Sequence, residues 1–462
     1  MNAADFTSGQ RRTVILLVMA VVVVVAMLVG FVVTSLQGWE SLTPVATLPF
    51  TPLPPTSLPT PPPSPSPIAS PTVEGLWSQV QDARLFGQIA HQVETLRGLS
   101  PRAEVPLSFL DEREMAALLR QFYTSGDLKA SLLPYTELGL LPDVLISVRP
   151  HQAAGIYVPE QEQLYVATGL QESSTDDQAL LAHAYIHALQ DQHFDLGAMD
   201  ARAATTDATL AIRSLAKGDA MLLTAFYRYG DPATADWEHL SELVLQAEQP
   251  GYGAELDLVE AWARLQRFPY WEGHHFADAL FQAGGWEVIN SAYINPPRST
   301  EQVLHPDRYL EGQDSPVYVT VPDLGAILDG GWTPLLQDTL GEFVTGLYLE
   351  SLLPEETAWR AADGWGGDTF VVWEHEEGER LLVWRTIWDS TAEATEFEQA
   401  LVALISQRYL PAWPVDHPPR GLAGQWWETG AGMICMSRVA RYVVFIHAPD
   451  IDTLANVVEV LP

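Results

Sequence analysis

Two histidines four residues apart are the residues of this sequence best placed to do chemistry. His183 and His187 lie in the segment 174–196, where Thr175 and Gln178 are expected to form a capping box at the start of a helix. Four residues rotate an α-helix by about 400°, so both imidazoles project from one face, as two ligands of one metal ion do. The alternative is two ordinary histidines on a helix face, so the surrounding residues decide between the two interpretations.

The sequence around these histidines resembles the active-site helix of gluzincin-type zinc metallopeptidases, and specifically an uncharacterised extracytoplasmic bacterial family. It reads AHAYIHALQDQHFDL, where that family typically has AHExxHALQDQHFDL. Nearly all of the chain after residue 72 is matched. The matching segments are the preceding strand pair, LAKGDAMLL (215–223), FPYWEGHHFADALFQAGGW (268–286), PPRSTEQVLHPDRY (296–309), DTLGEF (338–343) and GWGGD (364–368). The resemblance implies a mainly helical, gluzincin-like domain with a small sheet.

The same resemblance shows two departures at the positions that catalysis needs. In the HExxH motif the glutamate is the general base that acts on zinc-bound water, and this chain has Ala184 in its place. The family's third zinc ligand is a glutamate in an EGDA-like motif, and Lys217 stands there. A catalytic zinc site needs three protein ligands, so His183 and His187 are predicted to be vestigial ligands of a degenerate site. We therefore expect no cofactor, and zinc only if the chain is an active peptidase.

Lys217 has two possible placements. Its ammonium either occupies roughly the former zinc position and donates hydrogen bonds to His183 or His187, or it reaches solvent. Asp219 is no easy replacement for the missing ligand, because two residues of helix turn it about 200° away from Lys217. A different acidic side chain within bonding reach of both imidazoles would overturn the prediction of inactivity.

The remaining histidines are expected to be structural. His193 lies six residues after the pair and so falls off its helix face. His274 and His275 are adjacent and cannot both face one site from a helix. The resemblance suggests that His305 stabilised a transition state in active relatives, and the alternative is a structural turn before Pro306.

Composition restricts the class of protein. The 462 residues include 24 Lys and Arg against 59 Asp and Glu, and the formal charge of -35 excludes nucleic acid as a partner. The hydrophobic fraction of 47% and the charged fraction of 18% are those of a folded protein. The single cysteine, Cys435, cannot form a disulfide within the chain.

The first 72 residues have a different composition. Residues 14–33 carry no charge and are long enough to span a bilayer, so they are predicted to form a transmembrane helix. Arg11 and Arg12 precede this run and the next basic residue is Arg84, which predicts a cytoplasmic N-terminus and an extracytoplasmic remainder. Residues 43–72 contain 12 prolines among 30 residues, which is typical of an extended stalk.

Local patterns predict the elements of the folded part. We expect a helix over 76–99, a strand over 105–110, a helix capped by Asp111 and Glu114, and a strand pair over 154–168 with its turn at 159–162. The runs 370–373 and 381–386 read as strands. Ser390 with Glu393 caps a following helix, the runs 433–438 and 441–446 suggest a hairpin, and a short helix ends the chain.

The predicted fold class is α+β in five parts. These are a cytoplasmic tail (1–12), a transmembrane helix (13–36), a Pro/Ser/Thr-rich stalk (37–72), a degenerate metallopeptidase-like domain (73–355) and a small α+β domain (356–462). The predicted function is that of a single-pass protein of the cell membrane, which binds or scaffolds an extended peptide or an envelope protein without catalysis. The alternatives are an active zinc peptidase with an altered ligand set and base, and a purely structural envelope spacer.

Overall fold

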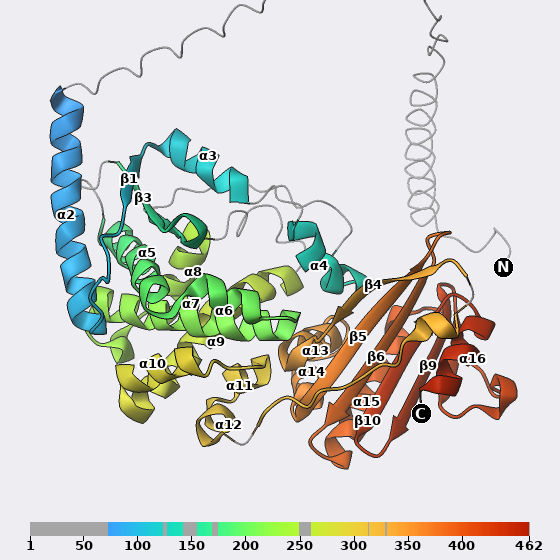
Figure 1. Ribbon diagram of the computed structural model, residues 1–462. Helices are drawn as coiled ribbons and strands as arrows, with labels where there is room; N and C mark the ends of the chain where they lie inside the picture. The colour runs from blue at the N-terminus through green and yellow to red at the C-terminus, as the bar shows by residue number, and fades with distance from the viewer. Residues whose placement is uncertain are drawn as a thin grey trace, which may run out of the picture. The chain divides into compact units, whose positions relative to one another are not determined.

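The computed structural model describes residues 73–122, 127–141, 155–168, 174–248, 260–312, 314–328 and 330–461. These ranges all lie in one unit of the chain, Ser70–Pro462. They form an α+β fold, in which a mainly helical part with a small sheet is followed by a large antiparallel sheet with its own helices (Figure 1).

The predicted fold class needs one correction, which concerns the membrane helix. None of the helices in the described ranges combines the length and the apolar character that a membrane span needs. The two longest, α2 (Val73–Arg97) and α9 (Glu260–Gly284), each have 25 residues but carry charged side chains along their length. The predicted tail, transmembrane helix and stalk lie outside the described residues. The structure therefore supports an α+β fold and shows no N-terminal transmembrane helix among the residues that it describes.

The small sheet has three strands in the order β1-β3-β2. Strand β1 (Leu107–Leu110) runs parallel to β3 (Gln163–Ala167), and β2 (Gly155–Val158) pairs with β3 in antiparallel fashion across a single 3-10 turn, η1 (Pro159–Gln161). The predicted strand pair and its turn are confirmed. Strand β2 is an edge strand of this sheet, which matters for the cavity described below.

Two further helices belong to this part of the chain. Helix α3 (Glu112–Phe122) begins at the predicted capping box, in which Asp111 and Glu114 exchange hydrogen bonds between side chain and backbone. Helix α4 (Asp127–Glu137) follows and contains Pro134. The predicted cap of α3 is therefore confirmed.

Four central helices carry or surround the two histidines, which lie on the first of the four. They are α5 (Thr175–Phe194), α6 (Leu196–Arg202), α7 (Thr206–Tyr229) and α8 (Trp237–Glu248). The capping box of α5 consists of Ser174 and Asp177, one residue before the predicted pair. The prediction of Thr175 and Gln178 was wrong because Ser174 is still extended, with ψ 169°, whereas Thr175 is already helical.

Helices α7 and α9 cross in backbone contact. A Cβ atom on Gly218 of α7 would lie 1.9 Å from the carbonyl oxygen of Gly273 on α9. A Cβ atom on Gly273 would in turn lie 2.5 Å from the carbonyl oxygen of Ser214. Only glycine permits this approach, which brings the side chains next to the crossing close together.

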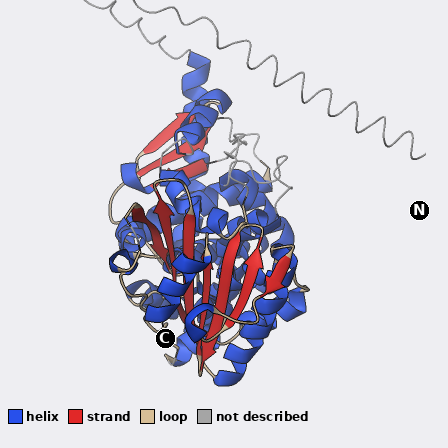
Figure 2. Ribbon diagram, turned by 90° about the vertical axis from the view of Figure 1, so that its right-hand side faces the viewer, coloured by secondary structure: helices blue, strands red, loops and turns tan. Residues whose placement is uncertain are grey.

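The large sheet has seven antiparallel strands in the order β4-β5-β6-β10-β9-β8-β7, seen face-on in Figure 2. The chain reaches it through α10 (Trp286–Ile294), α11 (Thr300–Leu304), α12 (Pro306–Glu311) and η4 (Leu324–Ala326). The strands are β4 (Trp332–Asp338), β5 (Trp365–His375), β6 (Arg380–Trp388), β7 (Ala412–Pro414), β8 (Gln425–Thr429), β9 (Gly432–Val439) and β10 (Tyr442–Ala448).

The two faces of this sheet are covered by different helices. Helices α13 (Gly341–Glu350), α14 (Glu355–Ala362) and α15 (Thr391–Arg408) pack on one face, and α16 (Ile451–Val460) packs on the other. The predicted strands, the Ser390 cap and the final helix are confirmed. Strand β4 joins the sheet before the boundary predicted at 355/356. The helical part shares a continuous apolar core with the sheet, which includes Leu215, Phe268 and Trp384.

Candidate functional site

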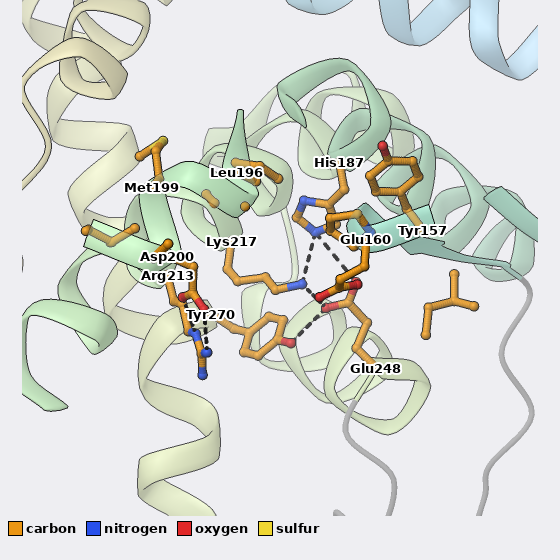
Figure 3. A pocket seen from close by; sticks show the side chains of 16 residues that line it. Tyr157, Glu160, His187, Leu196, Met199, Asp200, Arg213, Lys217, Glu248 and Tyr270 are labelled. Atoms are coloured by element: carbon orange, nitrogen blue, oxygen red, sulfur yellow. Dashed lines mark hydrogen bonds and ion pairs between the residues drawn. The ribbon is translucent and has the colours of Figure 1, made fainter. Parts of the chain in front are cut away.

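A cavity of about 670 Å³ lies between the edge strand β2 and the central helices (Figure 3). Its walls come from β2, η1, α5, α6, α7, α9 and the end of α8. His187, Lys217 and Glu248 point toward one another on one side of it, and Tyr270 contacts the same group. His187, Lys217 and Glu248 at this wall, together with the buried His183 behind them, form a polar cluster that we call the cavity cluster.

Nε2 of His183 carries a lone pair that points toward the other residues of the cavity cluster. Its Nδ1 lies 3.0 Å from Oγ1 of Thr224, whose hydroxyl donates its own proton to the carbonyl of Ala220. The hydroxyl oxygen must therefore accept a hydrogen bond from Nδ1, which leaves Nε2 unprotonated in the neutral ring. Burial lowers the pKa of His183 to about 3, so the ring is neutral at ordinary pH.

His187 has the same tautomer for a different reason. Its Nδ1 lies 2.7 Å from Oε1 of Gln190. The amide nitrogen of Gln190 donates to the carbonyl of Ala216 and to Asp219, so the amide orientation is fixed and Oε1 must accept from Nδ1. The two rings lie edge to face, 4.9 Å apart, and both direct an Nε2 lone pair to the same place.

Glu248, the last residue of α8, supplies a carboxylate at this place. Its Oε1 lies 3.5 Å from Nε2 of His183 and 3.6 Å from Nε2 of His187, and its Oε2 accepts a hydrogen bond from Tyr270. Burial alone would raise the pKa of Glu248, but Lys217 and the two imidazoles hold it well below its ordinary value. Glu248 is therefore the acidic side chain within reach of both imidazoles that the sequence analysis did not find, and it overturns the prediction of inactivity as far as that prediction rested on a missing third ligand.

Lys217 lies at the cluster rather than in bulk solvent. Its Nζ donates to Nε2 of His187 over 3.1 Å and to Oε2 of Glu248 over 2.7 Å, and it lies 5.6 Å from the centre of the Tyr270 ring. The side chain is 27% exposed, so the ammonium also faces the cavity. The hydrogen bond to His187 that the first of the two predicted placements includes is present, and the ammonium faces the cavity as well.

Residue 184, where the resemblance led us to expect a general base, is buried among apolar side chains. Ala184 is 2% exposed and belongs to the apolar cluster that contains Leu181 and Leu164. Strand β2 lies directly above it, because a Cβ on Gly155 would be 3.6 Å from the Cβ of Ala184. The site can bind a cation or a hydrogen-bonding ligand, but residue 184 cannot transfer a proton.

A second layer of polar residues holds His187 in place. Asp219 forms a buried ion pair with Arg97 at 2.8 Å and also accepts hydrogen bonds from Tyr293 and Gln190. Asp219 thus acts behind the cavity cluster and not within it. The position of Gln190, one helical turn after His187, could have indicated its role in the sequence, but nothing marks Arg97 or Tyr293.

The other histidines of the sequence analysis do not line the cavity. His193 Nε2 lies 2.8 Å from the carbonyl oxygen of Ser100. His274 stacks on Trp237 with ring centres 4.1 Å apart, and burial lowers its pKa to about 3. Nε2 of His305 lies 3.0 Å from Oε1 of Glu342, at the junction between α11 and α12.

A second group of buried carboxylates lies where the helical part meets the sheet, and we call Asp207, Asp338 and Asp368 the capping knot. Asp338 of β4 accepts a hydrogen bond from the backbone of Thr206 at the start of α7. Asp207 of α7 accepts one from the backbone of Thr300 at the start of α11. Burial raises the pKa of Asp207 to about 8, against the lowering effect of the hydrogen bonds from Thr300.

Asp368 completes the knot at a third helix. It accepts hydrogen bonds from the backbone of Leu340 and Gly341, which lead into α13, and from the indole of Trp365. Burial raises its pKa to about 6. The segments 296–309, 338–343 and 364–368, which the resemblance singled out, thus meet in a network that fixes helix ends.

The comparison with known families covers only the large sheet and the helices that pack on it. The model of a family described as a domain of unknown function (DUF8575) matches residues 334–458, which extend from β4 into α16. No curated protein and no solved structure matches this chain. The matched region contains Asp338 and Asp368 of the capping knot and none of the residues of the cavity cluster.

Proposed function

We propose that this protein is a metallopeptidase-like binding module that holds an extended peptide in the cavity beside β2 and does not cleave it. The observation that carries the proposal is the place of Lys217, whose ammonium is bonded to His187 and Glu248 on the cavity wall. A fixed ammonium at this point can bind a ligand oxygen, but it cannot lower the pKa of a bound water as zinc does.

The missing base supports the same conclusion. Peptide hydrolysis requires a group that removes a proton from water, and a general base typically contributes a factor of about 10² to 10⁴ in rate. Ala184 has no such group and is packed into the apolar core beneath β2. Glu248 offers a third ligand atom and so removes the argument for inactivity that the sequence analysis drew from the ligand set. The proposal of a non-catalytic module therefore depends on Ala184 and Lys217 alone.

The edge strand and the wall composition favour a peptide. An extended peptide can add to the edge of a sheet, and β2 is an edge strand among the residues that the structure describes. Its Ile156 and Tyr157 line the cavity. Leu196, Met199 and Ile212 provide an apolar wall for its side chains. Lys217 has three donors and two acceptors among the described residues, so its third N–H is available for a peptide carbonyl.

A binding experiment with a cavity-blocking variant tests the proposal. In Gly197→Trp the new side chain enters the cavity wall at a position where a Cβ has room, and Gly87→Trp on α2 is the matched control away from the cavity. We expect peptides recovered from a random library by the unaltered chain and by Gly87→Trp, but not by Gly197→Trp, and mass spectrometry should show them intact. Equal recovery by both variants would refute the cavity as the site, and the spacer alternative predicts no recovery at all.

The second candidate function is an active zinc peptidase with an altered ligand set. It is favoured by the convergence of His183, His187 and Glu248, whose ligand atoms lie within 4.8 Å of one another, and by Glu160, a carboxylate of η1 that lines the same cavity. This candidate predicts zinc-dependent peptide cleavage that Glu160→Gln abolishes and that Glu162→Gln, at a residue outside the cavity lining, leaves intact.

A further inference from the structure

We infer that His183, His187 and Glu248 form a binding site for a divalent transition metal such as Zn²⁺ or Co²⁺, and that Lys217 blocks this site by occupying it. The third ligand thus comes from the end of α8 and not from α7. The inference goes beyond peptide binding and does not depend on it.

The first argument is that three acceptor atoms converge in the cavity cluster, and that one of them, Nε2 of His183, has no donor among the described residues. The two Nε2 atoms carry lone pairs, and Glu248 accepts hydrogen bonds from Lys217 and Tyr270 through its carboxylate. Nε2 of His183 is buried and has no hydrogen-bond partner among the described residues, although it lies 3.5 Å from Oε1 of Glu248. A buried acceptor that faces another acceptor is unfavourable unless a cation lies between them.

The second argument is the spacing of the ligand atoms. Zinc–ligand distances of about 2.0–2.1 Å in a tetrahedral site correspond to ligand–ligand distances of about 3.4 Å. The separations from Oε1 of Glu248 to the two Nε2 atoms are 3.5 and 3.6 Å. Two histidines and one glutamate with a fourth position open to a cavity are a donor set that binds Zn²⁺ or Co²⁺.

The third argument is that both imidazoles are held in the metal-binding tautomer. Thr224 and Gln190 each accept a hydrogen bond from an Nδ1 atom, so that both Nε2 lone pairs stay available. Such partners behind metal ligands orient the rings and raise their basicity. The chain therefore keeps the supporting residues as well as the ligands.

Lys217 competes for the same atoms. Its Nζ uses the Nε2 lone pair of His187 and one oxygen of Glu248, and a lone pair cannot serve an ammonium and a metal ion together. An ammonium beside a divalent ion also adds charge repulsion within a few ångströms. The ammonium satisfies two of the three ligand atoms and leaves Nε2 of His183 without a hydrogen-bond partner among the described residues, whereas a metal ion would satisfy all three.

Titration of the metal-free full chain with Co²⁺ tests the inference, because tetrahedral Co²⁺ has a characteristic visible absorption. Lys217→Met keeps the aliphatic stem and removes the ammonium, and we expect it to bind one equivalent with an affinity on the order of 100-fold above that of the unaltered chain. The double variant with Glu248→Gln should lose this gain. Arg213→Met removes a positive charge from the same cavity without touching the ligands, and it should gain nothing.

Three results would overturn the inference. The first is tight stoichiometric binding by the unaltered chain, since Lys217 would then not block the site. The second is an equal gain in Co²⁺ affinity in Arg213→Met, which would show that the loss of any positive charge near the cavity is enough to cause the gain. The third is no gain in a Lys217→Met protein whose circular dichroism and melting temperature are unchanged, with Lys217→Gln as the second variant if the first does not fold. None of these measurements involves a peptide, so a result that overturns the metal site would leave the proposed peptide binding untouched.

Discussion

The cavity cluster and the capping knot both place ionisable groups in the interior, and they differ in how those groups are paired. Each aspartate of the knot accepts hydrogen bonds from backbone N–H groups at the start of a helix. In the cavity cluster three acceptors face one another, and a single ammonium satisfies two of them. Paired groups of the first kind hold a fold together. A buried acceptor without a donor among the described residues, such as Nε2 of His183, is typical of a binding site.

The largest expected effect is the loss of a knot carboxylate. Asp368→Ala leaves the N–H groups of Leu340, Gly341 and Trp365 without an acceptor in a region where Asp368 is 2% exposed. We expect the free energy of unfolding in urea to fall by about 3 kcal/mol or more. Asp450→Ala, at the exposed cap of α16, is the control and should cost about 1 kcal/mol. Similar losses of unfolding free energy in the two variants would show that the buried aspartates of the capping knot stabilise the fold no more than an exposed helix cap does.

The second prediction uses the pH dependence of the knot. The pKa of Asp207 is raised to about 8 in the folded chain, so its contribution to stability is complete below about pH 4 and is lost as the pH rises through 8. Asp207→Asn keeps an acceptor for Thr300 and cannot titrate. Between pH 6 and 8 the unaltered chain should lose about 2 kcal/mol relative to this variant, as measured by urea unfolding at each pH. Parallel curves would show that Asp207 is ionised throughout.

The third prediction tests the support behind the cavity cluster. In the Lys217→Met background, Thr224→Val removes the acceptor for Nδ1 of His183 and should weaken Co²⁺ binding by about 10-fold. Thr209→Val is the matched control on the same helix, because that hydroxyl only donates to the carbonyl of Thr205. A loss of the same size in both variants would indicate a change in helix α7 rather than in the ligand.

The smallest expected effect is that of Lys217→Met on stability. The loss of the ammonium leaves the largely buried Glu248 carboxylate without one donor, while the Lys217 side chain itself is 27% exposed, so the free energy of unfolding without bound metal should fall by about 1 kcal/mol. Thermal unfolding of the two proteins measures this change. A loss as large as that of Asp368→Ala would place Lys217 with the structural charges of the knot.

The comparison also separates what the sequence could predict from what it could not. Helical periodicity was enough to put His183 and His187 on one face, and alternation was enough to find β2 and β3. The resemblance identified Ala184 and Lys217. These features depend on residues that are close in the sequence.

The missed features depend on contacts between distant segments. Glu248 reaches the imidazoles only because Leu240, Val244 and Leu245 of α8 pack against Leu180 and Met221 of α5 and α7. No motif marks the last residue of such a helix. The capping knot was missed for the same reason, since each aspartate caps a helix that begins elsewhere in the chain.

The glycine contact between α7 and α9 gives the site a mechanical property. Gly218 directly follows Lys217, and Gly273 lies one helical turn after Tyr270. The carbonyl group of Gly273 occupies the place that a Cβ atom on Gly218 would take. Helices α7 and α9 therefore cannot slide or separate without losing van der Waals contact. Gly218 and Gly273, which have no side chain, therefore set the distance between the Lys217 ammonium and the Tyr270 ring. A methyl group added at either glycine would change this distance, and with it the electrostatic potential at the cavity wall.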